Sequence, residues 1–199
     1  MPHLCLRIIR EEHAALAAML RSLTLMVERG PKRDTEAFFT VLRAMLFYVD
    51  EFPERLHHPK ETELLFPKIR RSFPQISADL DRLDRDHAKG EANIRELQHL
   101  LLAWEFIGAT RRGAFEGACV RYVNFYIDHM RLEETLILPA AERSLSEEEW
   151  RELDEAFASN RDPLTRQYPP DPAYERLFAH ILLNAPTPIG VGVLPPTEN

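Results

Sequence analysis

The sequence contains one pair of residues three times: a histidine followed four positions later by a glutamate. The copies are His57 and Glu61, His87 and Glu91, and His129 and Glu133. On a helix this spacing places both side chains on one face, with Cβ atoms about 5–6 Å apart. His13 is an isolated further candidate near the start of the chain. Imidazole nitrogens and carboxylate oxygens suit Fe, Mn and Zn, so these residues predict a metal site.

Glutamates on the apolar face of a helix require a compensating charge. A lone histidine on such a face is usually a hydrogen-bonded core residue, whereas an unpaired buried carboxylate is costly. The positions around these glutamates on the apolar faces are mainly Leu, Ile, Phe and Tyr. Two iron ions would neutralise three carboxylates and leave charge for a bridging oxide or hydroxide. Mn and Zn are alternatives that the sequence does not separate from iron.

Hydrophobic periodicity predicts four long helices that carry these residues. The first ends at Gly30-Pro31, and the others cover roughly residues 35–71, 77–105 and 112–143. Pro53 and Pro59 are expected to bend or restart the second helix, because proline lacks a backbone donor. The connections are short, which favours antiparallel neighbours. The predicted fold class is therefore all-α, an up-and-down four-helix bundle with metal ligands in its core.

The heights of the ligands along these helices test the prediction. Counted from the turns at 1.5 Å per residue, His57 and His87 differ by about 6 Å, and His87 and His129 agree within a turn. His13 and His57 differ by about 12 Å. His13 therefore fits the common level least well, unless the bend at Pro53 changes the height of His57.

A proline-rich region follows the predicted bundle. Ser146 and Glu149 form an expected capping box for a short helix that reaches about Ser159. Beyond it the chain holds eight of its 15 prolines, with one further helix expected from about Asp171 to Leu183. We expect a single bundle domain, residues 1–160, and a C-terminal helical extension, residues 161–199, that packs on it.

Composition excludes several other classes of protein. The net charge of −7 and the absence of a long basic run argue against a nucleic-acid partner. No run of 18 apolar residues and no signal-peptide core occur, so we expect a cytoplasmic protein without membrane contact. Cys5 and Cys119 are too few for a disulfide framework and are expected to be reduced and structural.

The motifs around the candidate ligands resemble the hemerythrin-like HHE cation-binding domain family, over roughly residues 3 to 160. The motifs are His13, His57-His58-Pro59-Lys60-Glu61 leading into Leu64-Leu65-Phe66-Pro67, Asp86-His87-Ala88-Lys89-Gly90-Glu91, and His129-Met130-Arg131-Leu132-Glu133-Glu134. The resemblance implies a non-haem di-iron centre in a four-helix bundle. It also implies terminal histidine ligands at His13, His57, His87 and His129, with Glu61 and Glu133 bridging both irons.

One position departs from the pattern of the oxygen carriers that this family resembles. Oxygen-carrying hemerythrins have a histidine four residues after the third-helix ligand, where this chain has Glu91. A carboxylate there favours ferric iron, so reversible oxygen carriage is not expected. The predicted ligands are His13, His57, Glu61, His87, Glu91, His129 and Glu133. His58, interpreted as an exposed or outer residue, and Glu134 stay open as ligands.

These residues predict a protein that binds or senses O2 or NO, or handles iron, at a carboxylate-bridged site. One alternative is a di-iron enzyme with oxidase, peroxide-consuming or iron–sulfur repair activity. A second alternative is a structural metal in a partner-binding protein. The expected ligand is accordingly O2, NO or peroxide, and a protein partner or a homodimer is compatible with the sequence.

Overall fold

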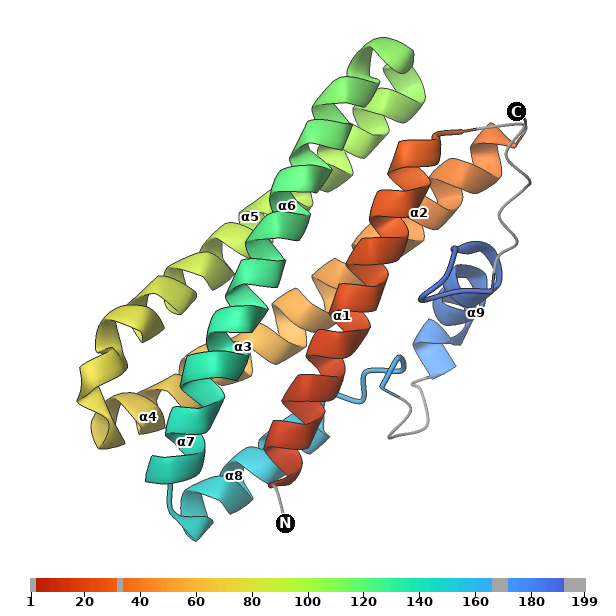
Figure 1. Ribbon diagram of the computed structural model, residues 1–199. Helices are drawn as coiled ribbons and strands as arrows, with labels where there is room; N and C mark the ends of the chain where they lie inside the picture. Colours follow the sequence, from red (N-terminus) through yellow and green to blue (C-terminus); the bar gives the residue numbers. More distant parts are fainter. Residues whose placement is uncertain (1–2, 32–33, 166–171, 192–199) are drawn as a thin grey trace.

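The computed structural model describes residues 3–31, 34–165 and 172–191, and every regular element within them is helical. Long helical rods lie lengthwise beside one another (Figure 1). The first rod is α1 (Leu4–Arg29) and the third is α5 (Ser77–Ile107). The second is a continuous run of α2 (Thr35–Val49), η1 (Asp50–His57), α3 (His58–Lys60), η2 (Glu61–Leu65) and α4 (Phe66–Ser72). The fourth joins α6 (Arg112–Leu132), η5 (Glu133–Ile137) and α7 (Leu138–Ser144). The prediction of an all-helical bundle is confirmed.

Turn chemistry explains where the rods begin and end. α1 ends at Gly30, whose φ of 65° lies in the left-handed region that favours glycine. The Asp34 side chain then caps α2 by accepting a hydrogen bond from the Ala37 amide at 2.9 Å. α5 ends at Gly108 with a φ of 105°. Short 3₁₀ turns, η3 (Pro74–Ile76) and η4 (Ala109–Arg111), lead into the third and fourth rods.

The apolar residues of the rods form two separate core clusters, and the candidate ligands lie between them. In α1, Ile9 belongs to one cluster and Leu16 to the other, with His13 midway. In each of the other three rods, the candidate ligands likewise lie between residues of one cluster and residues of the other. Cys5 and Cys119 are buried free thiols, one in each cluster, as expected of structural cysteines. The candidate ligands are therefore enclosed by apolar packing at both ends.

The second rod is not a uniform α-helix. Residues 50–57 and 61–65 are π-helical, and Pro53 lies inside the first of these segments. A π turn closes i→i+5 hydrogen bonds, so it holds more residues per turn and rises less per residue than an α turn. The second rod is consequently shorter than a uniform α-helix with the same number of residues. The rings of His13 and His57 lie 5.2 Å apart, which removes the predicted mismatch in height.

Two further helices cover the outside of the rods. α8 (Glu147–Ala158) packs on α1 and begins with the predicted capping box, in which the Ser146 amide donates to Glu149 at 2.8 Å. α9 (Glu175–Asn184) follows η6 (Pro172–Tyr174) and lies beside α2 (Figure 1). The expected helix start at Asp171 and the prolines at 169, 170, 195 and 196 lie outside the described residues. Within the described residues, none of the helices combines the length and apolar character needed to cross a membrane.

Candidate metal centre

The structure brings all the predicted ligands except Glu91 together between the two apolar clusters. Each of their side chains is buried, and none is more than 8% exposed. They are His13 from α1, His57 and Glu61 from the second rod, His87 from α5, and His129 and Glu133 from the fourth rod. The Nε2 atoms of His87 and His129 lie only 3.1 Å apart. The four rods therefore all contribute donor atoms to one buried cluster.

The cluster has two halves that share Glu61. The first half contains His13, His57 and Glu61, and the second contains His58, Glu61, His87 and His129; within each half the donor atoms all lie within 4.8 Å of one another. Glu61 directs one carboxylate oxygen to each half. Its Oε1 is 3.2 Å from His57 Nε2, and its Oε2 is 3.5 Å from His87 Nε2.

Glu133 spans the two halves in the same way. Its Oε2 lies 3.2 Å from His13 Nε2 in the first half. Its Oε1 lies 3.3 Å from His129 Nε2 and 3.8 Å from His87 Nε2 in the second half. Two carboxylates that each offer one oxygen to either side form the arrangement by which helical bundles hold a pair of metal ions.

His58 lies inside the second half, although its sequence position suggested an exposed or outer residue. It is 4% exposed, and its ring stacks on His87 with centroids 4.4 Å apart. Adjacent residues on a helix point about 100° apart. The second rod lies between α1 on one side and α5 on the other, so His57 faces α1 while His58 faces α5. Both histidines are buried because the rod has neighbours on both sides.

Glu91, a predicted ligand, is not part of the cluster. Its side chain is 53% exposed and pairs with Arg95, four residues further along α5. The buried seam of α5 continues from His87 through Gly90 to Ile94. Glu91 therefore points about 100° away from that seam. In the second and fourth rods, the residue four positions after the histidine, Glu61 or Glu133, points into the cluster. In α5 the inward position after His87 is i+3, which is Gly90.

Four of the five cluster histidines are hydrogen-bonded at their outer nitrogen, Nδ1; for the fifth, His129, the Asp86 carboxylate lies 3.9 Å away, beyond hydrogen-bond distance. The partners of the four are Glu134 for His13 (3.0 Å), Glu12 for His57 (2.6 Å), Glu54 for His58 (3.1 Å) and Thr62 for His87 (2.8 Å). Such contacts fix the orientation of an imidazole and direct its other nitrogen to a metal. Glu134, which the sequence left open as a ligand, thus lies on the outer side of His13. Glu12 likewise lies on the outer side of His57, and Asp86 on that of His129.

Glu54 is a buried residue of the site that the sequence did not indicate. It receives hydrogen bonds from Tyr122, at 3.0 Å, and from Tyr126. Burial raises its pKa to about 7, although both tyrosines act in the opposite direction. Gly90 packs against this network, since an added Cβ would lie 1.9 Å from the Tyr126 hydroxyl. The spacing of Glu54 four residues before His58 is the signal that could have identified it.

The charges of the cluster compensate one another. Burial alone would lower the pKa of His57, but the Glu61 charge and the hydrogen bond to Glu12 raise it well above the usual value. Burial likewise opposes a charged Glu133, yet the nearby His129 lowers its pKa well below the usual value. By contrast, burial and the neighbouring His87 lower the pKa of His58, which favours the neutral imidazole. A neutral imidazole is the form that binds a metal.

The donor set fits metal cations. His57 Nε2 and the four carboxylate oxygens of Glu61 and Glu133 are buried without hydrogen-bond partners. Buried polar atoms normally have a hydrogen-bond partner or bind a metal, because an uncompensated buried carboxylate is very costly. The nitrogen and oxygen donors suit Fe, Mn and Zn. Among the described residues, neither of the two groups of donor atoms includes a cysteine thiolate.

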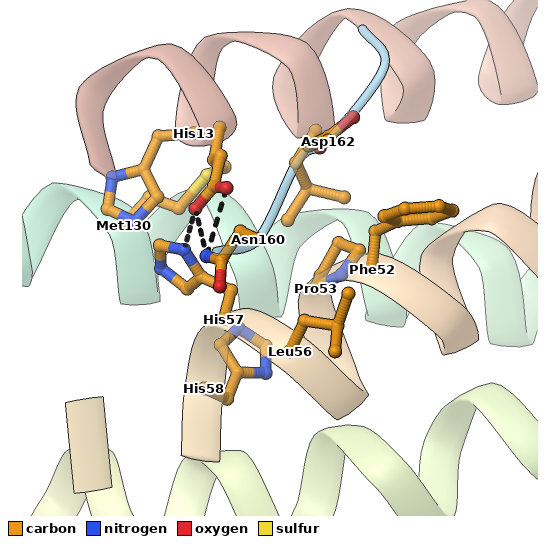
Figure 2. Close-up of a pocket in the computed structure, with 11 residues that line it drawn as sticks. His13, Phe52, Pro53, Leu56, His57, His58, Met130, Asn160 and Asp162 are labelled. Carbon is orange, nitrogen blue, oxygen red and sulfur yellow. Dashed lines mark hydrogen bonds and ion pairs between the residues drawn. The ribbon is translucent and has the colours of Figure 1, made fainter. Parts of the chain in front are cut away.

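A small cavity borders the first half of the cluster (Figure 2). It has about 10 Å³ of free volume, close to the minimum needed for one water molecule. Its lining combines His13 and His57 with apolar side chains such as Phe52 and Met130. Asn160, from the segment after α8, lies beside His57 at this cavity (Figure 2). The cavity therefore has the size and the position to bring a very small molecule next to the first half.

Comparison with known proteins agrees with this geometry. A family model described as the Hemerythrin HHE cation binding domain matches residues 5–141, which is more than half of the chain. The chain therefore belongs to this family, and its His/Glu cluster fits the metal site that the family name describes. No curated protein matches the sequence.

Proposed function

We propose that this chain is a non-haem di-iron protein that binds or senses O2 or NO, or handles iron. His13 and His57 would hold one ion, while His58, His87 and His129 would hold the other. The observation that carries the proposal is the position of Glu61 and Glu133. Each buried carboxylate offers one oxygen to either half and has no hydrogen-bond partner. Mn and Zn are alternative occupants of the same donors.

The remaining residues provide the conditions that such a site requires. A bound iron pair supplies one-electron redox chemistry and an open position for a small ligand. The Nδ1 partners keep the imidazoles oriented, and the apolar clusters limit water access to the donors. The cavity beside His13 and His57 leaves room only for a very small molecule. In this proposal residues 1–160 form an up-and-down four-helix bundle, and residues 161–199 are an extension packed on it.

One observation supports the enzymatic alternative, an oxidoreductase with oxidase, peroxide-consuming or iron–sulfur repair activity. Glu54 lies at the edge of the second half, in contact with His58, Tyr122 and Tyr126. Because burial raises its pKa to about 7, this carboxyl group can hold or release a proton near neutral pH. A proton donor at that position would serve turnover rather than simple ligand binding.

Metal content and ligand-dependent spectra test the proposal. Wild-type protein purified under iron-replete conditions should bind about two ions per chain, and Glu61→Ala or Glu133→Ala should reduce this to one or none. Anaerobically reduced protein should change its optical spectrum when O2 or NO is added. Folded variants that retain both ions would refute the shared-carboxylate arrangement. Oxygen or peroxide consumption that continues beyond one equivalent per site would favour the enzyme over the binding protein.

A further inference from the structure

Asn160 connects the segment after α8 to the candidate metal centre. Its side chain is 4% exposed, and its Nδ2 lies 3.0 Å from both carboxylate oxygens of Glu12. Glu12 in turn accepts a hydrogen bond from His57 Nδ1 at 2.6 Å. Figure 2 shows Asn160 close to the ring of His57. Asn160 lies beyond residues 5–141, the part of the chain that matches the family model.

Lys60 determines which way the Asn160 amide points. The Lys60 ammonium donates hydrogen bonds to the Asn160 carbonyl oxygen, Oδ1, and to Ser159 Oγ, the latter at 2.8 Å. A reversed amide would direct its NH2 group at the ammonium and its oxygen at the Glu12 carboxylate. Both contacts would then be repulsive. The amide therefore has one favourable orientation, in which it donates to Glu12.

The orientation of Glu12 depends on this amide. The Glu12 side chain is buried, with 7% exposure, so its carboxylate requires donors from the protein. The Asn160 NH2 group contacts both oxygens, which restricts rotation of the carboxylate about its last bond. Glu12 Oε2 then remains in position for His57 Nδ1, and His57 Nε2 remains directed at Glu61, 3.2 Å away. A continuous series of contacts thus runs from Lys60 through Asn160 and Glu12 to His57.

We propose that Asn160 is a positioning residue for the first half of the metal centre. By holding Glu12 against His57, it sets the metal affinity of that half and makes this affinity depend on the segment after α8. Asn160 has no such contact with the second half, where Glu54 and Thr62 hold His58 and His87. This inference rests on the proposed function only in requiring that the cluster binds metal.

The test compares the release of metal from Asn160→Ala, Ser159→Ala and wild-type protein. Ser159→Ala is the matched control, because it removes the neighbouring acceptor of Lys60 without touching Glu12. Proteins loaded with Fe(II) under anaerobic conditions are mixed with a chromophoric chelator, and the two release phases are followed. Asn160→Ala should release one of its two ions roughly tenfold faster and the other at the wild-type rate. Ser159→Ala should match wild type in both phases.

Equal acceleration of both phases, or wild-type rates in Asn160→Ala, would overturn the inference while leaving the di-iron proposal standing. Wild-type protein that binds no iron would overturn the proposed function and, with it, the inference. A double variant, Asn160→Ala with Glu12→Ala, adds a readout that general destabilisation would not produce. If Asn160 acts through Glu12, the double variant releases iron no faster than Glu12→Ala alone. If the two substitutions instead accelerate iron release by factors that multiply, Asn160 does not act through Glu12.

A second variant covers the case in which Asn160→Ala does not fold. Lys60→Met leaves the Asn160 side chain in place and removes the group that orients its amide. It should accelerate release of the same single ion, by a smaller factor than the loss of the amide itself. Wild-type release rates in folded Lys60→Met, together with an unfolded Asn160→Ala, would assign Asn160 a role in folding alone and overturn the inference.

Discussion

The imidazole of His58 stacks on that of His87, with ring centroids 4.4 Å apart and ring planes 12° from parallel. This contact places a further side chain of the second rod in the half of the site that contains His87 and His129. His58 supplies a nitrogen donor there, while Glu91, the expected carboxylate, points outward. Reversible oxygen carriage is not expected if Glu91 provides a carboxylate ligand to iron. In the proposed site that condition is not met, and the spectra with O2 decide the question.

Removing the His58 imidazole should weaken the second half selectively. In His58→Ala, one metal ion per chain should bind at least tenfold more weakly, because the half loses a donor and the support of the Glu54 network. Competition with a chelator measures this affinity. His99→Ala, an exposed histidine on the same helix as His87, is the control and should bind metal like wild type. Unchanged affinity in His58→Ala would leave His58 as a packing residue only.

Glu91→Ala should retain both metal ions. The Glu91 side chain is 53% exposed and contacts Arg95, so its loss removes only a surface ion pair. Such pairs contribute about 0–1 kcal/mol, and the free energy of unfolding should change by no more than that. Metal analysis and urea unfolding of the purified variant provide the two measurements. Loss of one ion would restore Glu91 as a ligand and show that α5 rotates when metal binds.

Gly90→Ala should destabilise the protein despite the higher helix propensity of alanine. The new methyl group would lie 1.9 Å from the Tyr126 hydroxyl and 3.0 Å from Glu54 Oε1, so the tyrosine must move out of its network. Overpacking of this kind costs roughly 1–3 kcal/mol. Gly117→Ala is the matched control, because its Cβ would meet only the flexible end of Arg121 at 3.4 Å.

Thermal unfolding of both glycine variants separates these effects. Gly117→Ala should gain up to about 1 kcal/mol from helix propensity, whereas Gly90→Ala should lose stability. If both substitutions stabilised the protein equally, the close packing of α5 against Tyr126 would be refuted.

The metal-free protein should lose stability as the pH rises above neutrality. Burial would lower the pKa of His129, but the Glu133 charge and the nearby Asp86 carboxylate raise it to about 10. An unfolded histidine titrates near 6.5. The folded state therefore holds this proton more tightly, which stabilises it fully below about pH 6.5, and this stability is lost as the pH rises toward 10.

Urea unfolding of chelator-treated protein at pH 6.5 and pH 9 checks this dependence. The free energy of unfolding should fall by up to roughly 3 kcal/mol between the two values. The metal-loaded protein should not show this fall, because metal displaces the proton from the ring nitrogen. His129→Gln, compared in the metal-free state, should reduce the slope. Greater stability of the metal-free protein at pH 9 would contradict the charge arrangement around His129.

Local periodicity in the sequence was sufficient to place most of the candidate site. His87 lies on the apolar seam of α5, and burial of that seam is what the three-four spacing encodes. The same seam runs through Gly90, so the period itself opposed Glu91 as a ligand. The i,i+4 spacing alone does not include that constraint. For Glu61 and Glu133, the i,i+4 spacing from a histidine and the position on the apolar face agree. Both residues are fully buried in the cluster.

The other differences arise from contacts that no local pattern encodes. The π-helical segments around Pro53 changed the height of His57, and a count that assumes a uniform α-helix cannot include them. Burial of His58 depends on the second rod having neighbours on both sides, which is a tertiary property. Asn160 contacts Glu12 across 148 positions of sequence. Long-range hydrogen bonds of this kind require the folded structure.

Anomalous diffraction at the iron absorption edge, from crystals of iron-loaded protein, tests the central claim most directly. We expect two anomalous peaks per chain, one at the ring nitrogens of His13 and His57 and one at those of His87 and His129. The carboxylates of Glu61 and Glu133 should contact both peaks. A single peak, or peaks outside this cluster, would contradict the proposal that two carboxylates shared between the halves hold a pair of iron ions.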